Sequence, residues 1–392
     1  MSITDDVKMR PLHEVLPITR GLLYLQAKGS EVAIPYWRGE PGIAKTALSN
    51  KMCADSDMNF VGTHYGQTPI EEVSGLPFYT DVKLIDGSEF KGTKWTKPEI
   101  LTDLCKIADS DRNKVTVWLL DDFHLASPGM MALGYEMFTE RKLRGYEIPN
   151  NVAILLAGNT SVKAGSKKNL FSAVANRCAI FPVYMDFDYW KKEFAIPNNV
   201  NSKILGFLSN PSYRKYVQEE EQLDKPWSSY RSWTKFSNIL NQLELYIQNL
   251  SINDVLYYCS SHCGDESASK FSAYYKIFSE VEVEKIFDKK IQIIIPSDMS
   301  NQYIYMIANV SEFNKRYFES KKENRLECIN IIGDIILEIA KTRIEISVVG
   351  LKEIALSEST LKLKDCYTLL KTTMNSKNPA LTKRIEDGIS RL

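Results

Sequence analysis

Five short apolar runs alternate with stretches of helical composition between Val32 and Pro197, and this alternation limits the folds open to the chain. Each run is continuously apolar or rich in β-branched and aromatic residues, as is typical of strands buried on both faces. The runs are Val32–Trp37, Phe60–His64, Val115–Leu120, Val152–Ala157 and Ala179–Val183. Strands that alternate with helices predict a parallel sheet covered by helices on both faces. We therefore expect an α/β fold here.

The character of the chain changes after about residue 200, where helical patterns replace the strand-like runs. A length of 392 residues predicts two or three domains. We place the boundaries near residues 197 and 250. This gives an α/β core over 1–197, a short helical part over 198–250 and a mostly helical domain of unknown role over 251–392.

A glycine-rich turn follows the first apolar run and precedes a stretch that favours a helix. It reads Gly39-Glu-Pro41-Gly42-Ile43-Ala44-Lys45-Thr46, with Ala47 opening the helical stretch. A loop of this kind at a helix N-terminus directs backbone N–H groups at phosphate oxygens, and its Lys and Thr reach the phosphates and Mg²⁺. The candidate nucleotide-binding residues are Gly39, Pro41, Gly42, Ile43, Ala44, Lys45, Thr46 and Ala47, and ATP or ADP with Mg²⁺ is the expected ligand. The alternative is a simple turn before a helix.

Ala44 occupies the position where the phosphate-loop pattern has its second glycine. Its methyl group costs little if the backbone angle φ is negative there, and more if φ is positive.

Two carboxylates, Asp121 and Asp122, follow the strand-like run that ends at Leu120. Ligands of open α/β sheets bind at the carboxyl ends of the strands, so both side chains are expected at the site. We assign Asp121 to Mg²⁺, opposite Thr46, and Asp122 to activation of the attacking water as a general base. An Asp-rich turn after a strand is the alternative. His124 lies close behind, but no step of this chemistry requires it, and we assign it a structural role.

Three further polar residues follow at positions that suit hydrolysis. Asn159 ends the fourth strand-like run, where its amide can orient water between Asp122 and the γ-phosphate. Arg177 ends the helix before the fifth run, and Arg231 lies in the first turn of a later helix. Both arginines can neutralise phosphate charge in the transition state. Alternatively, Asn159 is a turn residue, Arg177 is a helix C-terminal arginine favoured by the macrodipole, and Arg231 is an exposed arginine.

The order of these motifs resembles the AAA+ superfamily and, within it, the MoxR and dynein-related branch of bacterial or phage type. Gln67–Pro77 resembles the segment after the second strand there, and Glu140–Pro149 resembles the hairpin that precedes the fourth strand. Trp95, before a helix at Glu99–Ala108, also fits bacterial and phage members. The resemblance covers roughly residues 10–245, and residues 251–392 match nothing we can name.

This resemblance implies an ATPase core over 1–197, a helical lid over 198–250 and a ring, commonly a hexamer. It implies that Asn159 is sensor 1, Arg231 is sensor 2 in the same subunit, and Arg177 is an arginine finger for the neighbouring subunit. It also implies a von Willebrand factor A-domain partner and a protein client that is remodelled or matured. The family has Glu where this chain has Asp122, a residue one methylene shorter.

Composition indicates which partners and which cellular compartment to expect for the protein. Lys+Arg and Asp+Glu both number 49, and a net charge of zero gives no overall attraction to nucleic acid. The N-terminal decapeptide is polar and acidic, and no apolar run approaches the roughly 20 residues of a membrane helix. We expect a cytoplasmic protein without membrane contact. Seven cysteines, an odd number, are expected to be reduced thiols.

Three functions follow from these observations. The first is a Mg²⁺-dependent ATPase with active sites between the subunits of a ring. The second is a nucleotide-binding structural switch with little turnover, since Asp122 is short. The third is a nucleic-acid motor or a restriction-type GTPase, against which the zero net charge argues.

Overall fold

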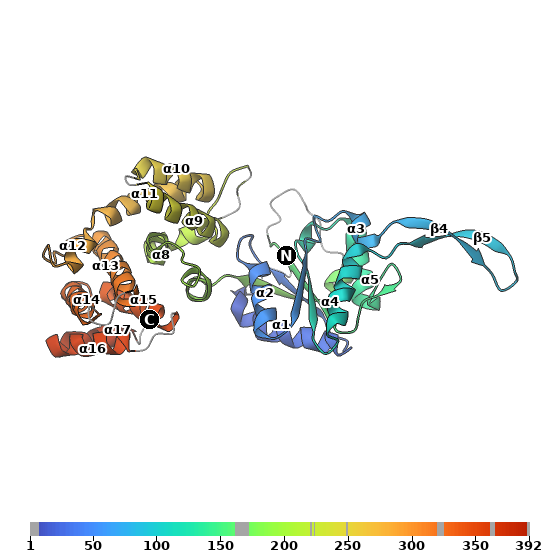
Figure 1. The fold of residues 1–392 in the computed structure, drawn as a ribbon, viewed down its shortest axis with the longest axis horizontal. Helices are drawn as coiled ribbons and strands as arrows, with labels where there is room; N and C mark the ends of the chain where they lie inside the picture. The colour runs from blue at the N-terminus through green and yellow to red at the C-terminus, as the bar shows by residue number, and fades with distance from the viewer. Residues whose placement is uncertain are drawn as a thin grey trace. The chain divides into compact units, whose positions relative to one another are not determined.

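The computed structural model describes residues 8–160, 172–219, 222, 224–247, 250–319, 325–360 and 365–389. The described residues before Phe187 form one compact unit, and those from Phe187 onward form a second. The first is built on a parallel sheet, and the second is helical (Figure 1).

The first unit contains a six-stranded parallel sheet in the order β1-β10-β2-β9-β6-β3. Its strands are β1 (Arg10–Pro11), β2 (Ile34–Arg38), β3 (Asn59–Thr63), β6 (Thr116–Leu120), β9 (Val152–Gly158) and β10 (Cys178–Tyr184). Five of the six are the expected strands, so the predicted parallel sheet is confirmed. The central strands β6 and β9 are buried along their whole length, which explains their continuously apolar sequences.

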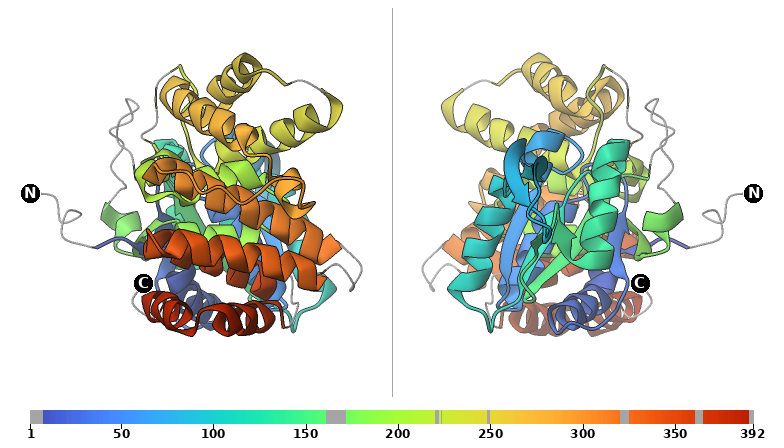
Figure 2. Two further views of the ribbon diagram at one scale, coloured as in Figure 1. Left: turned by 90° about the vertical axis from the view of Figure 1, so that its left-hand side faces the viewer. Right: turned by 90° about the vertical axis from the view of Figure 1, so that its right-hand side faces the viewer.

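Helices cover both faces of this sheet. On one face α1 (Leu12–Ala27) packs on β2 and β9, and α2 (Lys45–Asp55) packs on β3 and β6. The other face carries α3 (Ile70–Ser74), α4 (Glu99–Ser110), η2 (Phe123–Leu125), α5 (Pro128–Glu140) and α6 (Ser172–Ala175). Figure 2 shows both layers. A core of apolar side chains fills this second layer around Trp118, Phe123 and Met137.

Two antiparallel hairpins depart from the parallel sheet. The pair β7 (Lys142–Leu143) and β8 (Tyr146–Glu147) lies just before β9, within the segment that resembles a family hairpin. The pair β4 (Pro77–Lys83) and β5 (Glu89–Trp95) is longer, extends away from the sheet in Figure 1, and was not anticipated. Its strands have mostly exposed residues rather than apolar runs, so they lack the signal that identified the sheet.

The second unit is a stack of helices, which confirms the predicted helical C-terminal region (Figure 2). Its helix α14 is apolar on most of its circumference and buried among its neighbours. The elements are α7 (Phe187–Trp190), the π-helical η3 (Lys191–Ala195), α8 (Ser202–Ser209), η4 (Pro211–Val217), α9 (Tyr230–Tyr246), α10 (Ile252–Cys263), α11 (Asp265–Glu280), α12 (Val283–Phe287), α13 (Met299–Glu319), α14 (Arg325–Ala340), α15 (Ile344–Thr360), α16 (Cys366–Lys377) and α17 (Pro379–Ile389).

A buried ion pair joins the beginning of the second unit to its far helices. The Lys191 ammonium pairs with the Glu353 carboxylate of α15 and donates to Ser209 Oγ at 2.7 Å. Only 4% of the Lys191 side chain and 21% of the Glu353 side chain are exposed. Removing one partner of a buried pair leaves the other charge without compensation.

Replacing Lys191 with methionine is therefore expected to lower the free energy of unfolding of the second unit by about 3–5 kcal/mol. Urea denaturation followed by circular dichroism measures this change. The double variant Lys191→Met/Glu353→Leu should recover most of the loss, because neither charge then remains buried. The control is Lys215→Met, since both partners of the Lys215–Glu266 pair are more than half exposed and such pairs contribute less than about 1 kcal/mol. Equal losses in Lys191→Met and Lys215→Met would contradict the assignment.

Candidate active site

The glycine-rich loop connects the end of β2 to the start of α2. Gly39 donates its N–H to the carbonyl of Gly158 at 3.1 Å, which ties the loop to the end of β9. A β-carbon at position 39 would lie 2.5 Å from both Ile43 Cδ1 and the Val183 carbonyl oxygen. No side chain fits there, so glycine is required for the loop to pass between these groups.

Lys45 is buried at the base of this loop, with 8% of the residue exposed. Its ammonium donates at 3.0 Å to the carbonyls of Gly39 and Glu40 and to Asn159 Oδ1. Two of these acceptors belong to the loop and the third to the end of β9. The arrangement holds one positive charge inside the loop, at the beginning of α2, where the helix dipole also favours an anion.

Ala44 adopts a left-handed conformation, with φ 63° and ψ 30°, directly before the first residue of α2. The expectation left open whether φ is positive here, and the structure gives the costly alternative. A residue with a β-carbon loses about 1–2 kcal/mol in this region, whereas glycine does not. The loop therefore keeps the backbone course of a glycine with an alanine in place.

Replacing Ala44 with glycine is expected to keep or slightly raise the free energy of unfolding. The relief of about 1–2 kcal/mol exceeds the extra chain entropy of about 0.4–1 kcal/mol that glycine gains on unfolding. Ala47→Gly is the matched control, because Ala47 is an exposed residue with helical backbone in the same helix and should lose up to about 1 kcal/mol. Thermal denaturation of both variants compares the signs. If Ala44→Gly lowers the free energy of unfolding as much as Ala47→Gly does, the backbone at Ala44 is not strained.

Thr46 and Asp121 meet at the carboxyl ends of the strands. The Thr46 hydroxyl donates to Asp121 Oδ2 at 2.5 Å, and Asp121 is 8% exposed. The N–H of Asp122 donates to the other oxygen, Asp121 Oδ1, at 2.9 Å. A hydroxyl and a carboxylate that converge in this way are the hard oxygen donors that Mg²⁺ prefers, so the pair fits the expected metal.

Asp122 has a left-handed backbone conformation, and its carboxylate is held by Gln67, which follows the neighbouring strand β3. Its φ is 52°, in the left-handed region, and its Oδ2 accepts from Gln67 Nε2 at 3.1 Å. Gly66 allows the close approach, because a β-carbon there would lie 2.1 Å from the Asp122 carbonyl oxygen. Gln67 was not among the predicted site residues. Its position just after the second predicted strand could have indicated that it lies at the site.

Asn159 lies between Lys45 and His124. Its Oδ1 accepts from Lys45, and its backbone N–H donates to His124 Nδ1 at 3.2 Å. The next residue, Thr160, donates its hydroxyl to Glu40 Oε1 at 2.6 Å. The glycine-rich loop and the end of β9 are thus joined by two side-chain hydrogen bonds. Neither Glu40 nor Thr160 was among the predicted site residues.

Arg177 lies after α6, immediately before β10. Its guanidinium stacks over the ring of Tyr135 at 4.4 Å and donates to the Tyr135 hydroxyl and the Ala173 carbonyl. Within the described residues, none of the hydrogen bonds and ring contacts of its side chain involves the glycine-rich loop. Arg231 is exposed in the first turn of α9, which begins with the capping box of Ser229 and Ser232. It belongs to the second unit, so its role stays a prediction.

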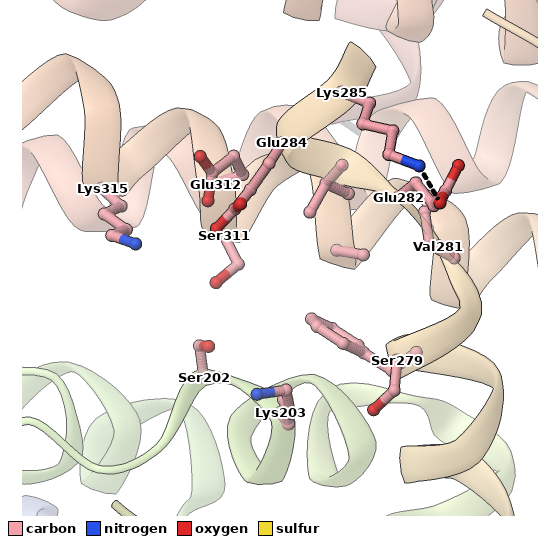
Figure 3. A pocket seen from close by; sticks show the side chains of 13 residues that line it. Ser202, Lys203, Ser279, Val281, Glu282, Glu284, Lys285, Ser311, Glu312 and Lys315 are labelled. Carbon is pink, nitrogen blue, oxygen red and sulfur yellow. Dashed lines mark hydrogen bonds and ion pairs between the residues drawn. The ribbon is translucent and has the colours of Figure 1, made fainter. Parts of the chain in front are cut away.

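The second unit contains a separate pocket of about 530 Å³ between α8, α12 and α13 (Figure 3). Four of the six charged side chains that line it form ion pairs: Lys285 pairs with Glu282, Lys203 pairs with Glu244 at 2.7 Å, and Glu312 pairs with Arg316 at 2.5 Å. Most of the charge that lines this pocket is therefore paired.

All seven cysteines are free thiols, and burial raises the pKa of Cys53 and of Cys178 to about 12. Within the described ranges no group of three or more His, Cys, Asp or Glu residues is placed to hold a metal ion. None of the helices described is long and apolar enough to cross a membrane.

Comparisons with known proteins add a limited amount. No protein-family model matches the chain, and no curated protein matches it. Among solved structures, the Thermotoga maritima RuvB Holliday junction branch migration motor is 14% identical, over 74% of this chain and 78% of its own, with a TM-score of 0.35. Two variants of that motor give 14% identity over 73% and 80% with a TM-score of 0.30, and 12% over 92% and 88% with a TM-score of 0.27. At these TM-scores the matches assign no role to individual residues.

Proposed function

We propose that this chain is a Mg²⁺-dependent ATPase of the AAA+ type, which works as a ring. The observation that carries the proposal is the convergence of Lys45, Asn159 and the Thr46–Asp121 pair at the carboxyl ends of β2, β9 and β6. Ligands of open α/β sheets bind at this edge. A buried lysine in a loop before a helix, hydrogen-bonded to an amide and followed by a threonine that meets a carboxylate, suits a nucleoside triphosphate and its hydrolysis.

The residues of the chain divide the work of hydrolysis. The loop backbone from Gly39 to Ala44 and the start of α2 bind the phosphates, and Lys45 exchanges its carbonyl acceptors for phosphate oxygens. Mg²⁺, bound by Thr46 and Asp121, would neutralise charge on the β- and γ-phosphates. Asp122 accepts the proton of the attacking water, and Asn159 orients that water toward the γ-phosphate.

The arginines extend the site beyond one α/β unit. Arg177 acts on the γ-phosphate of the neighbouring subunit, and Arg231 acts on the nucleotide of its own subunit. The stacking of Arg177 on Tyr135 supports the first role, because it holds the guanidinium on the surface with its plane fixed. We further propose a MoxR-like function, in which a hexameric ring remodels a protein client with a von Willebrand factor A-domain partner.

A nucleotide-dependent switch with little turnover is the second candidate. The Gln67–Asp122 hydrogen bond favours it, because it occupies one oxygen of a carboxylate that is already one methylene shorter than Glu. A base that is about 1 Å out of place can cost about 100-fold in rate.

Steady-state phosphate release, together with a mass measurement of the protein with and without ATP and Mg²⁺, tests the proposal. An ATPase gives multiple turnovers per minute and a nucleotide-dependent ring. Nucleotide binding and ring assembly without turnover would favour the nucleotide-dependent switch over the ATPase. Absence of nucleotide binding would exclude both.

A further inference from the structure

His124 joins the two strand ends that carry the predicted catalytic residues. It lies in η2, two residues after Asp122, and its Nδ1 accepts the backbone N–H of Asn159 at 3.2 Å. A β-carbon at Gly158 would lie 3.2 Å from this nitrogen and 2.5 Å from the Tyr36 hydroxyl oxygen. The imidazole therefore packs closely against the backbone at the end of β9, and the Tyr36 hydroxyl leaves no room for a β-carbon at position 158.

This hydrogen bond requires one protonation state of the ring. Nδ1 accepts a hydrogen bond only in the neutral imidazole, which carries its hydrogen on Nε2. Burial lowers the pKa of His124; Asp122 and, less strongly, Asp121 oppose this, whereas Lys45 and Arg38 reinforce it. Neutral Tyr36 of β2 packs on the same side. The surroundings therefore favour the neutral ring at neutral pH.

Fixing the Asn159 backbone also fixes its side chain. Asn159 Oδ1 reaches the Lys45 ammonium at 3.0 Å, so the amide lies within the reach of a bound γ-phosphate. Without its hydrogen bond to His124, the Asn159 backbone loses its attachment to the turn that carries Asp122. The distance between the amide and the base is then no longer set by the protein.

We propose that His124 is a positioning residue, which holds Asn159 in place relative to Asp122 and Lys45, so that ATP turnover depends on it while nucleotide binding does not. This inference rests on the proposed ATPase function. It differs from the structural role that the sequence suggested, because it assigns His124 an effect on kcat.

Three variants test the inference. His124→Leu removes the acceptor and is expected to lower kcat about 10- to 100-fold, with the KM for ATP and the affinity for a fluorescent ATP analogue nearly unchanged. His124→Asn places an amide oxygen close to the position of Nδ1 and is expected to retain most of kcat. His64→Leu is the matched control, because His64 is an exposed histidine after the neighbouring strand β3 and should leave kcat unchanged.

The pH profile separates positioning from a general effect on folding. As the pH falls through the lowered pKa of His124, the ring gains a proton on Nδ1 and can no longer accept from Asn159. The kcat of the wild-type protein should therefore decline on the acid side, and His124→Asn should lack this part of the decline. Equal losses of kcat in His124→Leu and His124→Asn, with unchanged pH profiles, would overturn the inference. So would full activity in His124→Leu.

A measurement without turnover keeps the inference separate from the proposed function. The chain has four histidines, so an NMR spectrum of isotopically labelled ring nitrogens is simple, and His124→Asn identifies the signal of His124. We expect a neutral ring protonated on Nε2. A ring protonated on Nδ1 at neutral pH would overturn the inference whatever the activity. A wild-type protein that hydrolyses no ATP would overturn the proposed function and the dependence of turnover on His124, while the spectrum would still decide whether His124 holds Asn159.

Discussion

Lys45→Ala should abolish nucleotide binding and reduce ATP turnover to background. The lysine is the buried cation of the loop, and its ammonium already meets three oxygens there. A hydrogen bond to a charged group contributes about 1.5–3 kcal/mol. Loss of two such bonds to the phosphates would weaken nucleotide affinity at least about 100-fold. Titration of a fluorescent ATP analogue measures the affinity, and phosphate release measures turnover.

Lys51→Ala is the matched control for this prediction. Lys51 lies on the same helix, its side chain is 43% exposed, and it pairs with Asp55 on the surface. Its removal should change neither affinity nor turnover. Circular dichroism of both variants checks that they fold. Retained affinity in a folded Lys45→Ala protein would exclude the glycine-rich loop as the phosphate site.

Arg177→Ala should spare nucleotide binding and lower turnover by about 10³-fold or more, which is the usual contribution of an arginine finger. The guanidinium is stacked on Tyr135, and it donates to Tyr135 and Ala173 rather than to the glycine-rich loop. An effect on turnover would therefore be exerted in a neighbouring subunit. Phosphate release at saturating ATP measures the loss. Arg112→Ala is the control, because its side chain is 80% exposed and should be neutral.

Mixing two inactive variants distinguishes action between subunits from action within one. A ring assembled from Arg177→Ala and Lys45→Ala subunits contains some interfaces at which an intact loop faces an intact Arg177. Such a mixture should recover part of the activity that each variant lacks alone. No recovery, in mixtures shown to contain both subunits, would place Arg177 in the active site of its own subunit.

The parallel sheet could be predicted because burial on both faces leaves a strong signal. Strands β6 and β9 have no exposed side, so their sequences are continuously apolar and end abruptly in polar residues. The β4–β5 hairpin could not be predicted in this way. Its residues are mostly exposed, and it is stabilised by local pairing rather than by burial in the core, so neither hydrophobic run nor strict alternation marks it.

The grouping of the candidate site residues could be predicted where a motif sets the residue types at short range, and could not be predicted where contacts span the fold. Lys45, Thr46, Asp121 and Asn159 lie together as expected. Gln67 touches Asp122 from 55 residues away, and Thr160 reaches Glu40 across 120 residues. No local pattern encodes such pairs, because they depend on which strands become neighbours in the sheet.

By itself, the sequence determined the α/β fold of the first unit, the helical character of the second and the residue types of the phosphate loop. Local periodicity and loop chemistry are sufficient for these. Only the tertiary structure decided the left-handed backbone of Ala44, the hydrogen bond from Gln67 to Asp122 and the contact between His124 and Asn159. The order of strands, with β9 between β2 and β6, brings these groups together, and that order is set by the packing of the whole sheet.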